Sequence, residues 1–393
     1  MVGASLAGLR AVETLRQQGY DGRLVFVGAE SSLPYDRPPL SKQVLAGDWS
    51  PDQLVLRSAD DYSSLALDMR LGRRATGLDL DTRAVVLDDG ERIGFDGLII
   101  ATGCRPRALP GTPDVEGIFM LRTLDDSLAI RDALDASPRV VVVGAGFIGS
   151  EVAATCRMKG LDVTLLEALP VPLARALGDE MGAACAELHR DHGVDLRVGV
   201  ALDGFDGDGR VERVRLSDGG AIDADVVVIG VGVAPETAWL EGSGLVLGDG
   251  VVCDATCFAS APGVVAAGDV ARWHNPLFGT DMRVEHWTNA AEQGMAAARA
   301  LLAGAGAEPF APVPYFWSDQ YDAKIQFVGM CAPDDEVRIV HGSVAERRFV
   351  ALYGRGGRLI GALALSRPRL LTVYRRLIAE QASWEDALAL EPA

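Results

Sequence analysis

The 393-residue sequence has little of what several protein classes require. Basic residues are scarce: 37 lysines and arginines stand against 55 aspartates and glutamates, a net charge of −18. A chain this acidic has no bulk positive charge with which to hold a nucleic-acid backbone. No apolar run approaches the roughly 18 residues of a membrane span, and no basic segment precedes a hydrophobic one at the N-terminus. We therefore expect a cytoplasmic protein that binds neither nucleic acid nor membrane.

Cysteine is also sparse, whereas glycine is abundant. Six cysteines are too few for a disulfide framework in a chain of this length, and we expect no metal site. The 45 glycines indicate many places where the backbone passes close to another group. The length predicts two to three domains, at roughly 150 residues each. The cysteines are Cys104, Cys156, Cys185, Cys253, Cys257 and Cys331.

The N-terminal stretch has the pattern of a dinucleotide-binding βαβ unit. The turn Gly3-Ala4-Ser5-Leu6-Ala7-Gly8 precedes a helical stretch (9–19), an apolar strand (24–28) and Glu30. Glycines at this spacing permit a tight turn and let a pyrophosphate reach a helix N-terminus, while the acid accepts hydrogen bonds from a ribose. Only two residues precede the turn, so we expect the sequence to begin inside the first strand. Ser5 replaces the middle glycine and can itself hydrogen-bond a phosphate.

A second copy of the same pattern begins about 140 residues further along. A strand (139–143) leads into Gly144-Ala145-Gly146-Phe147-Ile148-Gly149, a helical stretch that stops at Gly160, a strand (163–166) and Glu167. One such fingerprint is weak evidence, because glycine-rich turns occur between strands and helices of other α/β proteins. Two copies, each with the acid in place, favour two dinucleotide sites.

Three other strand ends and a change of character after residue 306 complete the outline. Apolar strands end in turns at 101–103, 230–232 and 268–269, and open parallel sheets bind ligands at such carboxyl ends. Stretches 82–92 and 210–223 alternate apolar and polar residues around turn signals, which predicts antiparallel hairpins. Beyond a small-residue linker and several prolines, short strands and a terminal helical stretch predict a third, α+β domain.

Four further motifs, in order along the whole chain, resemble those of the ferredoxin reductases of bacterial oxygenase systems, the family of putidaredoxin reductase and the arene dioxygenase ferredoxin reductases. These are two-dinucleotide flavoproteins of the glutathione-reductase type. The motifs are Pro34-Tyr35-Asp36-Arg37-Pro38-Pro39-Leu40-Ser41-Lys42, Leu121-Arg122-Thr123-Leu124-Asp125-Asp126, Glu285-His286-Trp287-Thr288-Asn289-Ala290 and Phe316-Trp317-Ser318-Asp319-Gln320-Tyr321.

The resemblance implies an α/β fold with two Rossmann-like dinucleotide-binding domains and a C-terminal α+β domain. It divides the chain into a discontinuous FAD-binding domain (1–108 and 233–306), an NADH-binding domain (109–232) and the C-terminal domain (307–393). It also implies the activity of a ferredoxin–NAD(+) reductase, which passes electrons from NADH through FAD to an iron–sulfur ferredoxin, expected to be of the two-iron type. That ferredoxin would feed a monooxygenase or dioxygenase.

Mapped onto this sequence, the resemblance puts Ala7 at the FAD pyrophosphate, Glu30 near its ribose, Ala75 at its adenine, Asp269 at its ribityl chain and Trp287 beside its ring. Members often carry an acid where this chain has Ala29. The expected FAD residues are Gly3, Ser5, Ala7, Gly8, Glu30, Arg37, Lys42, Ala75, Ala101, Thr102, Gly103, Arg122, Gly268, Asp269, Glu285, Trp287 and Trp317. Those expected for NADH are Gly144, Gly146, Ile148, Gly149, Glu167, Arg175 and Gly232.

Lys42 and Glu151 are the expected catalytic residues. Lys42 would stabilise negative charge on the reduced flavin and pair with Glu151 when no nicotinamide is bound. Each has an ordinary structural alternative: a solvent-exposed loop lysine, and a glutamate that faces solvent on its helix. Arg122 and Asp269 are equally open to a structural role as members of ion pairs, and Trp287 and Trp317 as core aromatics.

Three rival functions use the same or a related fold. A disulfide oxidoreductase or peroxidase places a redox cysteine beside the flavin, yet residues 1–103 contain none. A flavin monooxygenase requires an organic substrate pocket for which the sequence gives no sign. A signalling flavoprotein like apoptosis-inducing factor, or a rubredoxin as electron acceptor, stays open.

Basic residues gather near the C-terminus. Nine arginines between positions 337 and 376 face a single acid, Glu346, whereas residues 1–306 have a net charge of −17. An ordinary solvated face is one interpretation. Because redox ferredoxins are usually acidic, we instead expect a docking surface, in which the first candidates are Arg367, Arg369, Arg375 and Arg376.

Overall fold

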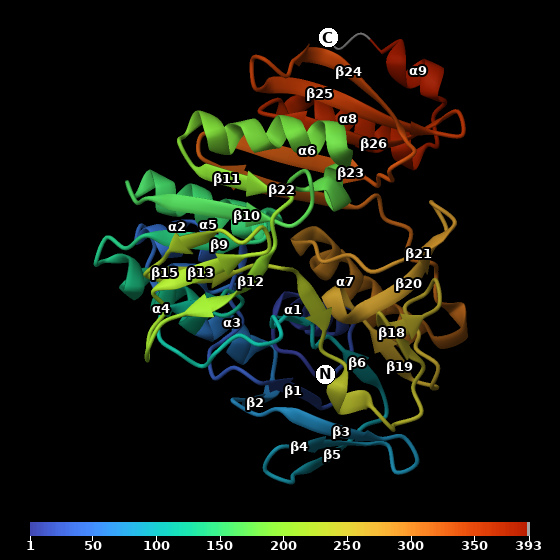
Figure 1. Cartoon of the computed structure of the whole chain (residues 1–393). Coiled ribbons are helices and arrows are strands. Elements are labelled where there is room, and N and C mark those ends of the chain that lie inside the picture. The colour runs from blue at the N-terminus through green and yellow to red at the C-terminus, as the bar shows by residue number, and fades with distance from the viewer. Residues whose placement is uncertain (391–393) are drawn as a thin grey trace. The chain divides into compact units, whose positions relative to one another are not determined.

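The computed structural model describes residues 1–390, which form two compact units (Figure 1). The first comprises residues 1–36, 52–105 and 234–314, and the second comprises 37–51, 106–233 and 315 onward. Each unit contains parts of more than one predicted domain, so the boundaries at residues 108, 232 and 306 stay predictions. The short strands β7 (Cys104–Pro106) and β16 (Val233–Pro235) lie where the chain passes from one unit to the other.

The first unit is built on a parallel sheet in which Val2 takes a central place. Val2 bridges in parallel to both Val27 and Ile100, so the two residues ahead of the glycine turn act as a strand between β1 and β6. The outer strands pair in parallel as well. The strands are β1 (Leu24–Gly28), β2 (Leu67–Leu71), β6 (Leu98–Ile100) and β19 (Val264–Ala266).

Side chains of successive residues on these strands face opposite sides of the sheet, which divides the first unit into layers. Phe26 and Ile99 pack under α1 (Leu6–Gln17) and α7 (Trp287–Ala303), whereas Val27 and Ile100 face two small sheets, one antiparallel and one mixed. The predicted hairpin over 82–92 is present as β4 and β5. The small sheets are β3 (Ala75–Asp79), β4 (Ala84–Leu87) and β5 (Arg92–Gly94), and β17 (Leu247–Gly248), β18 (Gly250–Cys253), β20 (Ala271–Asn275) and β21 (Thr280–Met282); α3 (Ala59–Ser64) and the 3₁₀ turns η2 (Pro51–Leu54), η3 (Ala238–Leu240), η4 (Gly268–Val270) and η5 (Gly304–Gly306) lie between elements.

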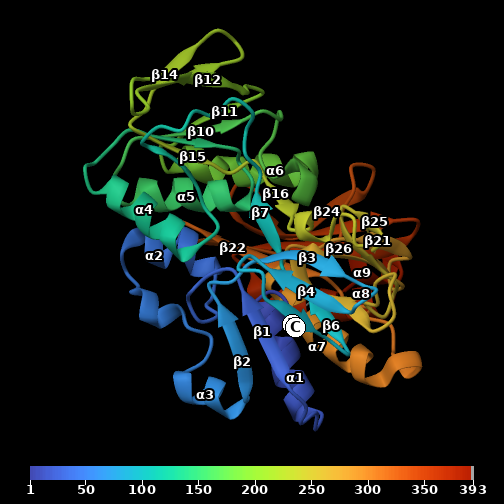
Figure 2. The same cartoon turned by 90° about the horizontal axis from the view of Figure 1, so that it is seen from below.

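The second unit contains a five-stranded parallel sheet with the same layering. Val140 and Val142 face α4 and α5, while Val141 and Val143 face a hairpin sheet; Figure 2 shows the helices and the hairpin sheet on opposite sides. Its strand order is β11-β10-β9-β15-β8. The elements are β8 (Ile118–Met120), α4 (Leu124–Leu134), β9 (Val140–Val143), α5 (Phe147–Met158), β10 (Val163–Glu167), β11 (Asp195–Val198), β12 (Leu202–Asp206), β13 (Arg213–Leu216), β14 (Ala221–Asp223) and β15 (Val226–Ile229), preceded by η1 (Pro38–Ser41) and α2 (Gln43–Ala46).

The C-terminal part of the second unit is an antiparallel sheet between helices. α6 (Ala174–Asp191) packs against one face of β22, β23, β25 and β26, as Figure 1 shows, and α8 (Pro368–Ala379) packs on β23 and β26. The predicted α+β character of this region is confirmed. The strands are β22 (Tyr315–Gln320), β23 (Ala323–Gly329), β24 (Glu336–Ser343), β25 (Arg348–Arg355) and β26 (Arg358–Leu365), followed by α8 and by α9 (Trp384–Leu388). Within residues 1–390 we find no helix with the length and apolarity that crossing a bilayer demands.

Candidate functional site

The first glycine turn brings three backbone segments into direct contact. Gly3 has φ +114°, and a Cβ added to it would lie 2.0 Å from the carbonyl oxygen of Ala101. A Cβ on Gly8 would lie 2.0 Å from the carbonyl oxygen of Gly3. No side chain fits at either place, so the turn, the first turn of α1 and the end of β6 meet as bare backbone. This cradle fits a pyrophosphate at the N-terminus of α1.

Ser5 stands at the N-cap position of α1. Its φ and ψ of −131° and −159° are extended, and within residues 1–390 its hydroxyl makes no capping hydrogen bond. Serine at an N-cap ordinarily accepts from a backbone amide of the first turn. The hydroxyl is therefore not used in capping, and its contact with a phosphate stays a prediction.

The predicted strand ends of the first unit converge on this cradle. A Cβ on Gly268, which has φ +77°, would lie 3.1 Å from the Cβ of Ala7. The amide of Gly268 donates to Gln293 Oε1 at 2.9 Å, and Thr102 Oγ1 donates to the carbonyl oxygen of Glu236 at 2.8 Å. The structure thus brings together Gly3, Ala7, Gly8, Ala101 and Gly268.

The acid predicted near the ribose is held by a tyrosine of the same unit. Tyr35 donates its hydroxyl hydrogen to Glu30 Oε2. The amide of Gly72 donates to the carbonyl oxygen of Glu30 at 2.9 Å, which places the loop ahead of β3 beside the acid. Ala75, the first residue of β3, is buried.

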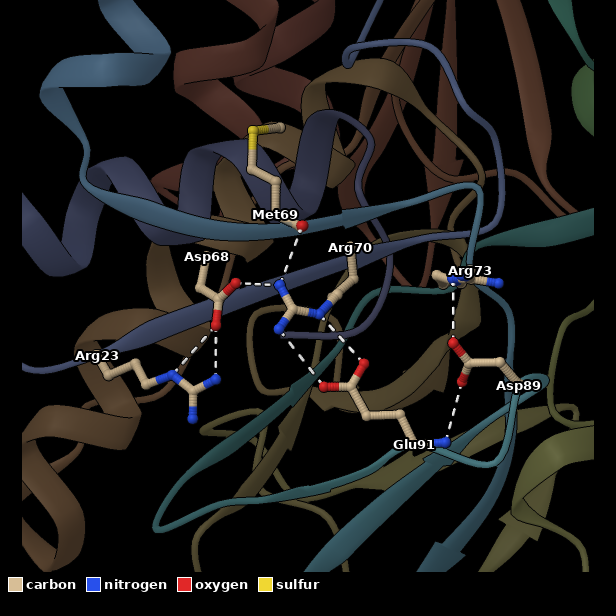
Figure 3. A network of polar contacts seen from close by, with 7 residues as sticks. All are labelled: Arg23, Asp68, Met69, Arg70, Arg73, Asp89 and Glu91. Carbon is tan, nitrogen blue, oxygen red and sulfur yellow. Dashed lines mark hydrogen bonds and ion pairs between the residues drawn. The ribbon is translucent and has the colours of Figure 1, made fainter.

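An ion-pair network that the sequence analysis missed surrounds this loop (Figure 3). Arg70 on β2 contacts both Asp68 and Glu91, and Arg73 lies 3.2 Å from Asp89. The network also includes Arg23 through Asp68. It joins β2, the loop and the β4–β5 hairpin. Sequence spacing gave no signal for it, because Arg23, the β2 pair and the β4–β5 turn are far apart in the sequence.

Near Asp269, two further polar residues stand out. Cys104 Sγ donates to Asp269 Oδ2 at 3.1 Å, and Arg283 donates to the carbonyl oxygen of Asp269 at 3.1 Å. Arg283 also pairs with the predicted Glu285 at 2.7 Å, and its side chain is 9% exposed. Sequence reasoning missed both partners; an arginine two residues before the Glu285 motif was the available signal.

Trp287 begins α7 and is anchored by its ring nitrogen. Nε1 donates to Asp36 Oδ1 at 2.6 Å. The preceding His286 is half-buried, and desolvation of its ring lowers its pKa to about 4, against a smaller opposing effect of Asp269. At neutral pH the imidazole therefore carries no charge.

The second glycine turn repeats the contacts of the first. Gly144 has φ +99°, and its Cβ would lie 2.5 Å from the carbonyl oxygen of Gly230; a Cβ on Gly149 would lie 2.0 Å from the carbonyl oxygen of Gly144. At Gly146 a Cβ would meet no atom of residues 1–390 within 4 Å. Ile148 is 46% exposed in the first turn of α5. The cradle fits a second pyrophosphate.

Glu167 at the end of β10 turns back onto this cradle. Its Oε2 accepts from the amide of Ala145 and its Oε1 from the amide of Leu169, each at 2.9 Å. A carboxylate has about four lone-pair sites, so both oxygens retain capacity for a ribose hydroxyl. Arg175 is exposed near the start of α6, and Gly232 has φ +99°.

The expected catalytic pair is in contact and largely shielded from solvent. Lys42 Nζ donates to Glu151 Oε2 at 2.7 Å, with side-chain exposures of 13% and 4%. The two structural alternatives, an exposed loop lysine and a solvent-facing glutamate, are therefore wrong. Glu151 also accepts from Ser41 Oγ and from Ser318 Oγ, the latter at 2.8 Å. Neither serine was singled out from the sequence.

The motif around Arg122 is partly a helix cap. Thr123 accepts from the amide of Asp126, which in turn accepts from the amides of Arg122 and Thr123, the capping box of α4. Arg37 donates to the carbonyl oxygen of Arg122 at 2.6 Å, so these two predicted residues are adjacent. Trp317 is half-buried in β22 and stacks on Tyr315 with ring centroids 6.0 Å apart.

Five of the six thiols are buried, and that of Cys331 is half-buried. Within residues 1–390 no two of them form a disulfide, and burial raises the pKa of Cys156, Cys185 and Cys253 to about 12 and that of Cys331 to about 11. Thiols that stay protonated are poor nucleophiles. The same residues contain no cluster of histidine, cysteine or carboxylate groups that fits a metal ion.

Comparison with known proteins covers the chain from end to end. Residues 1–294 match the family model described as pyridine nucleotide-disulphide oxidoreductase, and residues 315–393 match the one described as reductase C-terminal. Putidaredoxin reductase of Pseudomonas putida is 35% identical over all of this chain and 92% of its own length. The ferredoxin–NAD(+) reductase component of the anthranilate 1,2-dioxygenase system of Burkholderia cepacia is 36% identical over 96% of this chain and 93% of its own.

A solved structure shows the same fold. In the covalent putidaredoxin reductase–putidaredoxin complex, the matching chain superimposes with a TM-score of 0.94 at 34% identity, covering 99% of this chain and 95% of that one. The predicted fold class, with two dinucleotide-binding parts and a C-terminal domain, is confirmed.

Proposed function

The chain belongs to the pyridine nucleotide-disulphide oxidoreductase family, and from that membership we propose that it is an NADH-dependent ferredoxin reductase of an oxygenase system. The observation that carries the proposal is the doubled cradle: two turns in one chain where a Cβ would strike backbone at 2.0 Å. One cradle suits FAD and the other NADH. The family's name refers to disulfide chemistry, for which a redox-active cysteine pair would be needed.

The cofactors supply chemistry that the side chains do not. When bound, FAD converts the two-electron hydride of NADH into the single electrons that an iron–sulfur protein accepts. The chain's own task would be to bind both cofactors, to orient their reacting rings and to balance charge. Ser5 and Gly8 would offer the FAD pyrophosphate a hydroxyl and a backbone amide, while Gln293 fixes the amide of Gly268.

Lys42 and Glu151 are the residues proposed to act at the reacting rings. The ammonium group of Lys42 would stabilise negative charge on reduced flavin. Its buried ion pair with Glu151 supports a role, because a buried pair with full hydrogen bonding is not an ordinary surface feature. Asp269, Trp287 and the other predicted contacts belong to the same proposal.

We propose that the second cradle prefers NADH to NADPH. Glu167 would accept from the 2′-hydroxyl of NADH and repel the 2′-phosphate of NADPH. The two backbone amides that it already accepts from hold the carboxylate at the cradle. Arg175 is exposed nearby in sequence and would soften the discrimination.

The proposed partner is an acidic ferredoxin, of the two-iron type, that docks on α8. Arg369 and Arg376 are exposed and lie seven residues apart, so they share one face of the helix. Arg367 and Arg375 are half-buried. Arg376 lies 3.9 Å from Glu380, an exposed pair that costs little to exchange for a partner's carboxylate.

Three other arginines of the basic region already form ion pairs within the second unit. Arg347 pairs with Asp191 and Glu187 of α6, Arg355 with Asp335, and Arg338 with Glu336. These pairs remove Arg338, Arg347 and Arg355 from the proposed docking surface. We also propose a cytoplasmic location, which the lack of disulfides among the six cysteines of residues 1–390 supports.

A panel of purified ferredoxins tests the function. We expect NADH-dependent reduction of cytochrome c that requires added ferredoxin. Activity with rubredoxin alone would show that rubredoxin, and not a ferredoxin, is the electron acceptor. A slow, tight complex with NADH that reduces no acceptor would indicate the signalling function instead.

The docking surface has its own test. R369E/R376E should raise the apparent KM for ferredoxin about tenfold and leave NADH-to-ferricyanide turnover unchanged. Wild-type turnover with ferredoxin should fall as salt rises, since steering is screened beyond about 10 Å at 0.1 M. R338E is the matched control, because Arg338 lies on β24 and already pairs with Glu336. An unaltered KM at low salt would show that α8 is not the docking site.

A further inference from the structure

Helix α5 and strand β22 meet along a matched line of residues within the second unit. Phe147 and Glu151 lie one helical turn apart, about 6 Å along α5. Phe316 and Ser318 lie two residues apart on one face of β22, about 6.6 Å. The two spacings agree, so Phe147 packs on Phe316, with ring centroids 4.6 Å apart, while Ser318 reaches Glu151.

The two oxygens of the Glu151 carboxylate accept from different numbers of donors. Oε2 accepts from Lys42 and Ser41, whereas Ser318, at 2.8 Å, is the one donor to Oε1 among the described residues. Glu151 is 3% exposed, and Ser318 is fully buried. Water therefore does not replace the serine, and a buried charged oxygen left without a donor is costly.

Gln320 decides which way the hydroxyl of Ser318 points. Gln320 Nε2 donates to Ser318 Oγ at 3.2 Å, and Gln320 is fully buried as well. A serine hydroxyl has one hydrogen to donate. Because the oxygen already accepts from Gln320, its hydrogen is directed to Glu151. The chain of donors runs from Gln320 through Ser318 to the carboxylate.

We propose that Ser318, oriented by Gln320, is a positioning residue that holds Glu151 charged and paired with Lys42. Strand β22 of the C-terminal region thereby sets how much positive charge Lys42 presents to the flavin. The inference rests on the proposed function, since it takes Lys42 to lie beside the flavin ring.

Loss of the Ser318 hydroxyl should shift the flavin's reduction potential in one direction. Without a donor at Oε1, the carboxylate of Glu151 either takes up a proton or turns away from its site. In both cases less negative charge opposes the ammonium group of Lys42. More positive charge near the flavin favours its reduced form, so the flavin's reduction potential rises.

The test is an equilibrium reduction of the FAD-loaded protein with dithionite against a reference dye. S318A should raise the equilibrium constant for reduction about tenfold, which is 29.6 mV for a two-electron couple. E151Q should give a shift of the same sign, and S318A should add nothing in the E151Q background. S150A is the matched control: Ser150 is also a buried serine next to Glu151 on α5, and its hydroxyl has no partner within residues 1–390. We expect S150A to leave the potential unchanged.

Two results would overturn the inference: an unchanged potential in S318A, or equal and additive shifts from S318A and E151Q. Because dithionite supplies the electrons, this outcome does not depend on NADH. Failure of the wild-type flavin to be reduced by NADH would instead overturn the proposed function. Thermal unfolding of the apoprotein variants separates a change in folding from a change in potential.

Discussion

The two glycine cradles have the same backbone contacts but use their acids differently. In each, the last glycine lies where a Cβ would be 2.0 Å from the carbonyl oxygen of the first. Glu30 accepts from the hydroxyl of Tyr35, a side chain five residues further along. Glu167 accepts from two backbone amides, one of which belongs to the cradle itself.

The shared backbone contacts and the different partners of the acids have separate physical causes. Close approach of backbone to backbone is a steric requirement that any pyrophosphate-binding turn of this kind meets with glycine. The partner of an acid depends on the loop that follows it, and the two loops differ in sequence. The cradles should therefore respond alike to a change of glycine and differently to a change of acid.

The largest effect is expected from alanine at the last glycine of each cradle. G8A should lower the affinity for FAD by more than about 100-fold, or ~2.7 kcal/mol. G149A should retain FAD, and its rate of flavin reduction by NADH should fall by the same factor. Flavin absorbance per protein and the rate of flavin bleaching by NADH measure the two losses. G146A is the control for folding, because its Cβ meets no atom of residues 1–390 within 4 Å. Retention of both functions in G8A and G149A would show that the cradles are not nucleotide sites.

Acid is expected to destabilise both units, because each contains a histidine, half-buried in the first and buried in the second, that is neutral at pH 7. Burial lowers the pKa of His286 in the first unit and of His189 in the second to about 4. The unfolded chain binds these protons below pH 6.5, so stability is present above that pH and is lost as the pH falls toward 4. At pH 5 each histidine should cost about 2 kcal/mol.

Unfolding of the apoprotein at pH 7 and pH 5 measures this loss. Other groups contribute to acid unfolding, so the variants H189Q and H286Q isolate the two histidines. Each should reduce the difference in stability between the two pH values. A difference equal to that of the wild type in both variants would contradict the assignment.

The two acids should give unequal effects. E167Q places an amide group opposite two backbone N–H donors and loses one of its hydrogen bonds, so kcat/KM for NADH should fall about tenfold with little change for NADPH. E30Q can still accept from Tyr35 and should change FAD affinity by no more than about threefold. Wild-type kcat/KM values that are equal for NADH and NADPH would remove the assignment of Glu167.

The smallest effect is expected from the cysteines, with one difference between the units. Replacing Cys156 and Cys185 of the second unit with alanine should leave NADH-to-ferricyanide turnover within about twofold, apart from losses in folding. Cys104 of the first unit donates to Asp269, so C104A should weaken FAD retention more than C104S, which keeps a donor. Loss of turnover in a folded, FAD-loaded variant lacking all six thiols would restore the disulfide-reductase alternative.

Much of the architecture could be read from the sequence because it follows from local rules. Both glycine turns, the strands that flank them and the helix stops at Gly19 and Gly160, with φ of +84° and +83°, are consequences of backbone sterics within a few residues. The helix predicted over 9–19 begins at Leu6 and ends at Gln17, a shift confined to its ends. The α+β character of the C-terminal region likewise follows from strand periodicity and turn residues.

Tertiary structure decided which polar side chains are buried together. Glu151 is separated from Lys42 by 109 residues and from Ser318 by 167, and no local pattern relates them. The same holds for Arg283 under Asp269 and for the pairs that Arg347 makes with α6. Steric constraints on the backbone act between residues that are close in sequence, so the sequence alone indicates them. Burial and charge pairing depend on which surfaces pack against each other, and only the folded chain determines that.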